Sequence, residues 1–291
     1  MAGTPPAEID INPKLVHTLL QAQHPDLAHL PITYMSEGWD NIMFRLGEEM
    51  TVRLPRRQKA AHLLKNEQDW LPKLTKDFPI PTPIPIRNGN PDTNYPWHWS
   101  VLPWLKGDTA NLQQPDDDQV EVFIDCLKKL HQPATENTPK NIFRGVPLME
   151  RASDIDKRLT SLKAKTNFIT KEIEQIWQAA IHAPMPSTSY WIHGDMHTRN
   201  ILVHEGKISG IIDWGDMTAG DVANDLVPIW MLWANKSTRQ RAFDIYEVTP
   251  ELLTRAKGWG VYFAAVLLDT GLVDNPEHAE MGRVTLERLV E

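Results

Sequence analysis

The segment from Trp191 to Asp225 constrains this chain more than any other, because it joins an unusually acidic loop to a β-hairpin pattern. Its 35 residues contain six Asp or Glu and only two Lys or Arg, which gives it half of the chain's net charge of −8. Like charges gather in a folded protein only where a cation compensates them. We therefore expect a cationic group to compensate the acids of this segment.

The hairpin pattern predicts that two metal ligands lie near each other. Two apolar runs flank a Glu205-Gly206 turn. With those two residues as the loop, Asn200 lies opposite Ile211, and Asp213 is its diagonal neighbour on the same face, about 7–8 Å away. Mg²⁺ binds through one or two protein oxygens plus substrate phosphates, so one ion could bridge the amide and the carboxylate.

A motif with two histidines and an aspartate precedes this hairpin. Residues 193–200 read H-G-D-x-H-x-x-N, and a D-W-G sequence begins at Asp213. In protein kinases, H-R-D-x-x-x-x-N supplies an Asp that receives the proton of the substrate hydroxyl and an Asn that holds metal, while D-F-G supplies a second metal ligand. The spacing from Asp195 to Asn200 is the same here, and D-W-G stands in place of D-F-G.

This combination resembles the aminoglycoside phosphotransferase family, which comprises bacterial antibiotic kinases and relatives with a protein-kinase-like fold. The resemblance implies ATP or GTP, Mg²⁺ and transfer of the γ-phosphoryl group to a hydroxyl of a small molecule. It implies that Asp195 is the catalytic base and that Asn200 and Asp213 are the Mg²⁺ ligands. His193 would brace the loop, and His197 would be either a structural loop histidine or a direct participant.

Three further acids, Asp216, Asp221 and Asp225, continue the charged run after the motif. They could form salt bridges, cap helices or face a cationic substrate. We carry them forward as candidate substrate-binding residues.

The amino-terminal third predicts a short helix that starts at Asn12-Pro13, then a three-stranded antiparallel meander over residues 32–53. A helix over residues 58–71 follows, and Pro72 should end, kink or restart it. In a kinase-like lobe, the turn between the first two strands covers the phosphates, and here it contains Ser36 and a single glycine, Gly38.

The third strand of a kinase-like lobe should carry a Lys that pairs with a Glu on the helix. This chain departs from that pattern, because Arg53 stands there, with Glu67 as its expected partner. Arginine binds phosphate as a fork, but it is not equivalent to lysine.

The break at residues 103–107 is the predicted boundary between two lobes. The backbone at Trp104 and Leu105 would line the pocket for the nucleotide base. We expect an α+β protein-kinase-like two-lobe fold, with an antiparallel sheet and one main helix in residues 1–103, which would bind the nucleotide. Residues 104–291 would form a mostly helical lobe for catalysis and substrate binding, with helices over 120–131, 151–180 and from 226 to the end. At 291 residues the chain is long enough for two lobes with a crevice between them.

The composition narrows the choice of partners and location. A net charge of −8 argues against nucleic acid or an anionic membrane as the main partner. The longest apolar runs fall far short of the roughly 20 residues that span a bilayer. A single cysteine, Cys126, cannot form an internal disulfide or a thiolate metal cluster, so we expect a cytoplasmic protein. We also expect it to be a monomer or a dimer.

Several functions remain open from the sequence. An acidic pocket suits an aminoglycoside, and some of the eleven tryptophans could line a macrolide site, either of which would make the protein an antibiotic-resistance kinase. An amino alcohol or sugar metabolite is an alternative acceptor. A metal-dependent hydrolase is a rival, because His193, Asp195 and His197 alternate and would line one face of a strand like zinc ligands. A non-catalytic member of the fold that binds nucleotide or a partner protein is another.

Overall fold

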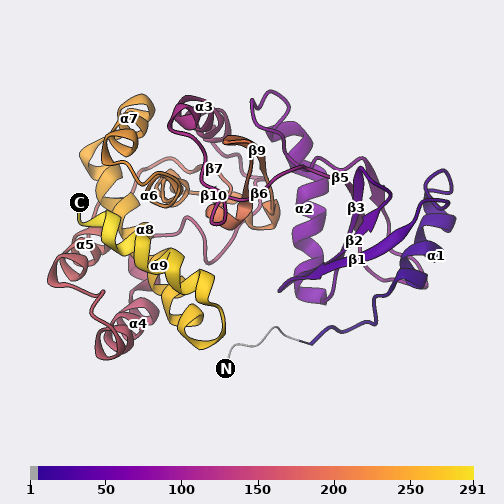
Figure 1. Cartoon of the computed structure of the whole chain (residues 1–291), viewed down its shortest axis with the longest axis horizontal. Coiled ribbons are helices and arrows are strands. Elements are labelled where there is room, and N and C mark those ends of the chain that lie inside the picture. Colours follow the sequence, from indigo (N-terminus) through magenta and orange to yellow (C-terminus); the bar gives the residue numbers. More distant parts are fainter. Residues whose placement is uncertain (1–5) are drawn as a thin grey trace. The chain divides into compact units, whose positions relative to one another are not determined.

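The computed structural model describes residues 6–291, which form two compact units (Figure 1). Unit 1 comprises the described residues up to Asp77 together with Pro81–Lys106, and unit 2 comprises Phe78–Ile80 together with Gly107–Glu291. The expected boundary between residues 103 and 104 lies three residues before the second of these divisions. The combination of antiparallel sheets and separate helices confirms the predicted α+β class.

Unit 1 is built on a five-stranded sheet in the order β1-β2-β3-β5-β4, in which all neighbours are antiparallel. Its strands are β1 (Ile32–Glu37), β2 (Asn41–Leu46), β3 (Met50–Pro55), β4 (Arg87–Gly89) and β5 (Trp99–Pro103). The predicted meander is therefore confirmed as β1–β3. Alternation along these strands separates an apolar face from a face that carries Arg53.

The apolar face of the sheet packs against helix α1 (Pro13–Gln23). The register pairs Phe44 with Val52 and Val52 with Val101, so these buried side chains share one face. The helix begins as predicted, because the Asn12 side chain accepts hydrogen bonds from the backbone N–H groups of Lys14 and Leu15, both at 3.1 Å. Capping and burial thus fix α1 against the sheet.

Helix α2 (Gln58–Leu74) packs on the opposite face of the sheet, as Figure 1 shows. Arg53 pairs with Ser100 across β3 and β5, so both side chains point toward α2. Gln68 of α2 donates to the Trp99 carbonyl at 2.8 Å and to Ser100 Oγ at 3.0 Å. The helix continues past Pro72, which lies in its last turn, so Pro72 does not end it.

The helices of unit 2 gather around α8, a 25-residue helix that contacts α4, α5 and α9. Its apolar residues face all directions, as expected of a helix surrounded by others. The helices are α3 (Val120–Leu130), α4 (Ala152–Lys165), α5 (Lys171–Ile181), α6 (Pro228–Leu232), α7 (Lys236–Tyr246), α8 (Pro250–Asp274) and α9 (Pro276–Leu289). The stretch predicted as one helix over 151–180 is two, because Thr170 caps a new helix by accepting from the Ile173 N–H.

Two small sheets in unit 2 flank the motif loop at residues 193–200. Antiparallel strands β7 (Tyr190–Ile192) and β10 (Thr218–Gly220) form one, and β6 (Asp108–Thr109), β8 (Ile201–His204) and β9 (Lys207–Ile211) form the other. The hairpin turn lies at residues 205–206 as predicted, but the register beyond it is wrong by one residue. A bulge at Ser209 pairs Ile201 with Ile211, so Asn200 faces Ile212 instead.

In the described part of the chain, residues 6–291, no helix is both long and apolar enough to cross a bilayer.

Candidate active site

The motif loop of unit 2 brings Asp195, Asn200 and Asp213 into one backbone network. Asn200 Nδ2 donates to the carbonyl oxygen of Asp195 at 2.9 Å. The Ile212 N–H donates to the carbonyl of Asn200, also at 2.9 Å, which places Asp213 next to this pair. The bulge therefore changes the predicted register without separating the predicted residues.

His193 ties the two sides of this network together. The side chain is fully buried, and its ring lies 4.7 Å from that of Trp214. Nε2 donates to the carbonyl of Ile212 at 3.0 Å, and Nδ1 accepts from the Asp195 N–H at 3.3 Å. Both ring nitrogens are thus committed to the backbone, which is the geometry of a bracing residue.

The Asp195 carboxylate lies between an arginine and a histidine. Oδ1 is 2.6 Å from Arg144 Nη2, and Oδ2 is 3.8 Å from His197 Nε2. Burial raises the pKa of the carboxyl, but the positive charge of Arg144, together with the proximity of His197 and His193, outweighs it, so the pKa is lowered. Asp195 is therefore ionised at neutral pH.

His197 has a local structural role and also faces Asp195. Its Nδ1 accepts from the Arg199 N–H at 3.2 Å and caps the short turn at residues 198–200. Burial lowers the pKa of this imidazole, so it is neutral and carries its proton on Nε2, toward Asp195. At 3.8 Å this contact is too long for a hydrogen bond.

Arg144 is the site residue that sequence reasoning missed. Its Nε donates to Asp216 Oδ2 at 3.1 Å, while Nη2 holds Asp195. The other oxygen of Asp216, Oδ1, accepts from Asn141 Nδ2 at 2.9 Å. Arg144 precedes Asp195 by 51 residues and lies outside any helix or strand, so neither spacing nor periodicity could reveal it.

The three acids proposed to bind substrate differ in their surroundings. Asp216 is partly exposed, and burial raises its pKa despite the opposing charge of Arg144. Asp221 is buried and pairs with Arg255 Nε at 2.7 Å. Asp225 is fully buried and accepts from the backbone N–H groups of His193 at 2.6 Å and of Gly194 at 3.0 Å. These placements differ from the expectation that Asp221 and Asp225 face a substrate, because both carboxylates brace the interior instead.

The donor set fits a hard cation at Asn200 and Asp213. Nδ2 of Asn200 is committed to the Asp195 carbonyl, so the amide presents its oxygen on the other side. Asp213 is exposed and adopts a left-handed backbone conformation, with φ of 60°. An amide oxygen and a carboxylate are the ligands Mg²⁺ prefers.

The rival zinc site is not supported by the geometry. Residues 193–197 form a loop after β7, so their side chains do not alternate along a strand as expected. Both nitrogens of His193 are engaged and cannot ligate zinc. Residues 6–291 contain no group of three or more His, Cys, Asp and Glu arranged to hold a metal ion.

In unit 1, Arg53 and Glu67 form a buried ion pair between β3 and α2. Arg53 Nη1 lies 2.8 Å from Glu67 Oε1 and 3.1 Å from Oε2. With the amide of Asn41 turned so that its oxygen faces the guanidinium, Oδ1 accepts from Nε at 3.1 Å and from Nη2 at 2.8 Å. The expected pairing is therefore present, while its role in nucleotide binding stays a prediction.

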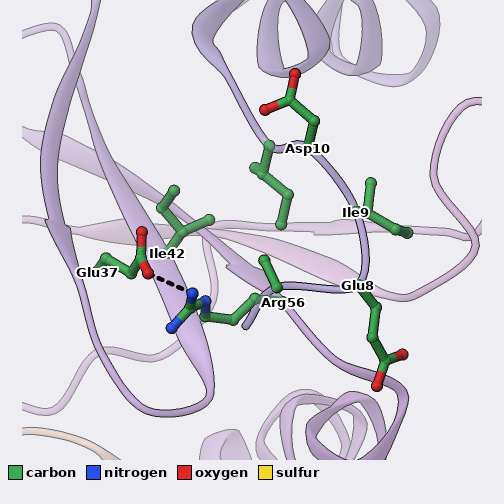
Figure 2. A pocket seen from close by; sticks show the side chains of 8 residues that line it. Glu8, Ile9, Asp10, Glu37, Ile42 and Arg56 are labelled. Carbon is green, nitrogen blue, oxygen red and sulfur yellow. Dashed lines mark ion pairs between the residues drawn. The ribbon is translucent and has the colours of Figure 1, made fainter. Parts of the chain in front are cut away.

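The turn that contains Gly38 is held by two arginines, Arg56 and Arg57. Arg56 is buried, pairs with Glu37 and donates to the Gly38 carbonyl at 2.9 Å. Figure 2 shows this pair beside a pocket of about 320 Å³ lined by residues 7–11. Arg57 holds Asp40 at 2.5 Å. Ser36 is exposed on β1, and a Cβ on Gly38 would lie 3.6 Å from the Asn41 carbonyl oxygen, an ordinary van der Waals distance.

The residues proposed to contact the base lie at the end of β5. Trp104 is exposed, and its ring stacks under the Arg45 guanidinium at 4.0 Å. Its backbone N–H already donates to the Glu49 carbonyl at 2.7 Å. This bond leaves Leu105, rather than Trp104, as the candidate backbone donor to a base.

Comparison with known proteins identifies relatives among phosphotransferases. The profile of the family described as "Phosphotransferase enzyme family" matches residues 31–259. The uncharacterized protein YcbJ of Bacillus subtilis is 27% identical over 218 residues, covering 69% of this chain and 68% of its own. An aminoglycoside 3'-phosphotransferase of Escherichia coli is 27% identical over 202 residues, covering 65% of this chain and 71% of its own.

A solved structure has the same fold. The GDP complex of aminoglycoside 2'-phosphotransferase-IIIa superposes with a TM-score of 0.66 at 17% identity, covering 96% of this chain and 99% of that one. The fold predicted from the sequence, with an antiparallel sheet in the first part and mostly helices in the second, is confirmed.

Proposed function

Because this chain belongs to the phosphotransferase enzyme family, we propose that it transfers the γ-phosphoryl group of ATP or GTP to a hydroxyl of a small molecule. The observation that carries this proposal is the network of the motif loop, in which an ionised Asp195 lies beside the amide of Asn200 and the exposed Asp213. The similarity to an aminoglycoside 3'-phosphotransferase supports it.

Asp195 would orient the acceptor hydroxyl and take its proton. Phosphoryl transfer leaves the protein little covalent work, so positioning and charge neutralisation provide most of the acceleration. A carboxylate with a lowered pKa is a weak base, but it accepts a hydrogen bond from a hydroxyl at any physiological pH. The neutral His197 beside it adds no charge that would oppose this role.

Asn200 and Asp213 would hold Mg²⁺. When bound, this ion neutralises negative charge on the phosphates of the nucleotide. The bond from Asn200 Nδ2 to the Asp195 carbonyl orients the amide oxygen, and His193 fixes the backbone at Ile212 just before Asp213. The protein's own contribution is therefore a prepared pair of oxygen ligands.

The proposed nucleotide contacts all come from unit 1. Arg53, held by Glu67 and Asn41, would present its guanidinium to the phosphates. The turn with Ser36 and Gly38 would cover them. The backbone N–H of Leu105 would bind the base, since that of Trp104 is occupied.

The acceptor we propose first is an antibiotic, either an aminoglycoside or a macrolide. An amino alcohol or a sugar metabolite is the second candidate. The burial of Asp221 and Asp225 favours this second class, because it removes two of the three carboxylates that a polycationic aminoglycoside would need. We propose a cytoplasmic location, where ATP and GTP are available and where the free thiol of the buried Cys126 would persist.

Nucleotide turnover tests this proposal. Release of ADP or GDP would be measured with panels of aminoglycosides, macrolides, amino alcohols and sugars, and the phosphorylated product identified by mass spectrometry. We expect turnover with one class of acceptor, dependent on Mg²⁺ and lost in Asp195→Ala. A folded protein that neither binds Mg²⁺ with nucleotide nor transfers phosphate to any acceptor would contradict the proposal and would favour the non-catalytic alternative.

A further inference from the structure

We propose that Arg144 is a positioning residue for catalysis, which clamps the Asp195 carboxylate in place and is itself anchored by Asp216. This inference rests on the proposed function, because it assigns a role in the same phosphotransfer site. It concerns two residues whose roles the sequence motif does not indicate.

The clamp is a continuous chain of polar contacts. Asn141 Nδ2 donates to Asp216 Oδ1 at 2.9 Å, and Asp216 Oδ2 accepts from Arg144 Nε at 3.1 Å. The same guanidinium reaches Asp195 Oδ1 through Nη2 at 2.6 Å. Because the guanidinium is planar and rigid, fixing one edge on Asp216 fixes the direction in which it holds Asp195.

The clamp leaves the working face of Asp195 open. It engages only Oδ1, while Oδ2 lies 3.8 Å from the neutral His197 and forms no closer contact with it. The Asp195 side chain is 23% exposed, so this carboxylate is accessible to an acceptor. A hydroxyl can therefore bind Oδ2 without displacing Arg144.

The backbone around Arg144 is built for close contact with the catalytic loop. Gly145 has φ of +61°, and a Cβ there would lie 2.5 Å from Ile192 Cδ1 and 2.8 Å from the Cα of Gly220. Its carbonyl accepts from the Asp221 N–H at 2.9 Å. A Cβ on Gly194 would lie 2.6 Å from the Asp216 carbonyl and 3.2 Å from Arg144 Cβ. The segments that carry Arg144, Asp195 and Asp216 are thus interlocked by tight backbone contacts, which an incidental surface ion pair would not require.

The charges also favour an arginine shared by Asp195 and Asp216 over an ion pair between Arg144 and Asp195 alone. Burial opposes the charge of the guanidinium, but the two carboxylates outweigh it and raise the pKa of Arg144. One arginine between two carboxylates leaves a net negative charge on the group. Asp195 can therefore still accept a hydrogen bond, and then a proton, from the acceptor hydroxyl. The ring of Phe263, 5.5 Å from the guanidinium carbon, covers the side chain.

Steady-state kinetics of four variants test the clamp. In Arg144→Gln we expect kcat to fall about 100-fold, the loss typical of a misplaced reacting group, with KM for the nucleotide nearly unchanged. Asp216→Asn should lose about tenfold, and the double variant should be no slower than Arg144→Gln, because both changes break one unit. Arg144→Lys should recover part of kcat, since an ammonium can reach one carboxylate but cannot fork between two.

Arg158→Gln is the matched control. Arg158 of α4 pairs with Asp269 of α8 at 2.5 Å in the same unit, and neither residue belongs to the motif loop at residues 193–200. It should leave kcat unchanged. Thermal unfolding of each variant distinguishes a protein that has lost its fold from one in which only the Asp195 carboxylate is misplaced. If Arg144→Gln does not fold, the kinetics of Asp216→Asn and Arg144→Lys test the clamp.

Two results would overturn the clamp. One is a folded Arg144→Gln with kcat within about threefold of wild type, and the other is a double variant whose losses simply multiply. If the wild type itself shows no phosphotransfer, the proposed function fails, and the clamp is then judged by crystal structures of wild type and Arg144→Gln. Displacement of the Asp195 carboxylate by about 1 Å or more would support it. In that case an unmoved carboxylate would refute it.

Discussion

Two arginines, one in each unit, hold carboxylates in contrasting ways. Arg53 and Glu67 join a strand to the helix that follows it, and their side chains are only 9% and 5% exposed. Arg144 joins a loop to Asp195 and Asp216, and its side chain is 19% exposed while theirs are 23% and 28%. The first pair is set in the interior of a small unit, whereas the second lies at a surface that a ligand can reach.

An ion pair between an arginine and a carboxylate can therefore stabilise the fold in one place and position a reacting group in another. A buried pair that loses one partner leaves an uncompensated charge inside the protein, and this costs much stability. A partly exposed pair contributes little to stability, because water screens it. We therefore expect changes at Arg53 to affect folding first and changes at Arg144 to affect turnover first.

The largest effect is expected at Asp195. Asp195→Asn should lower kcat by about 10³-fold, within the range attributed to a positioned acid or base, because the amide cannot take the proton of the acceptor. The midpoint of unfolding should change little, since Arg144 can still donate to the amide oxygen. Asp125→Asn, at an exposed position on α3, serves as the control. If the folded Asp195→Asn enzyme retained near-normal turnover, Asp195 would not be the base.

Breaking the buried pair of Arg53 and Glu67 tests whether this pair contributes to the stability of the fold. Arg53→Met should destabilise the protein by about 3–5 kcal/mol in urea unfolding, because it removes the positive charge that faces the buried Glu67 carboxylate. The double variant Arg53→Met with Glu67→Leu should recover most of that stability but should still bind nucleotide poorly. Arg144→Gln should cost only about 1 kcal/mol or less. Equal losses of stability at the two arginines would break the comparison.

Asp225 offers a buried carboxylate inside the catalytic unit. Burial raises its pKa, but the His131 side chain, the nearby charges and the backbone N–H groups outweigh it and lower the pKa. A lowered folded-state pKa gives stability that is present above the unfolded value of about 3.9 and is lost as the pH falls through the folded value. Asp225→Asn should therefore cost about 2–3 kcal/mol at neutral pH, since its amide cannot accept from two N–H groups as well.

The same variant has a pH signature that unfolding curves can follow. The stability difference between wild type and Asp225→Asn should shrink as the pH falls below about 4, where the wild-type carboxyl is protonated in the unfolded state. A difference that stayed constant from neutral to acidic pH would mean that the charge of Asp225 does not contribute.

Gly145, next to Arg144, allows the tight packing around the clamp to be tested. Gly145→Ala places a Cβ at φ of +61° against Ile192 and Gly220, and it should cost about 1–2 kcal/mol. Gly47→Ala is the matched control, because Gly47 has φ of +59° but its nearest neighbour would be 3.6 Å away. The two variants should differ in their loss of unfolding free energy only because the Cβ at position 145 is crowded by Ile192 and Gly220. Equal losses would show that this close packing at Gly145 does not matter for stability.

Local patterns in the sequence were sufficient for much of the fold. The α1 cap at Asn12, the meander of unit 1 and the motif loop follow from spacing that is local in the chain. The pairing of Arg53 with Glu67, 14 residues apart, was expected from the resemblance to kinases, whose third strand pairs with the helix that follows it. These features depend on neighbours in sequence, so a single chain is enough to predict them.

What the sequence did not reveal depends on long-range packing. The bulge at Ser209 shifted the register, because alternation alone does not show where one extra residue is accommodated. Arg144 reaches Asp216 across 72 residues, and Arg56 is buried by the turn that it holds. Asp221 and Asp225 could not be recognised as internal, since their partners come from elsewhere in the unit.

Calorimetric titration of Mg²⁺ and nucleotide into wild type and Asp213→Ala tests the central claim most directly. Asp213 and Asn200 are proposed to hold the metal on which nucleotide binding depends. We predict that Mg²⁺ strengthens binding of ATP or GTP to the wild type and that this strengthening disappears in Asp213→Ala, while Asp125→Ala behaves as wild type. An Asp213→Ala protein that bound nucleotide with the same Mg²⁺ dependence as the wild type would contradict the account.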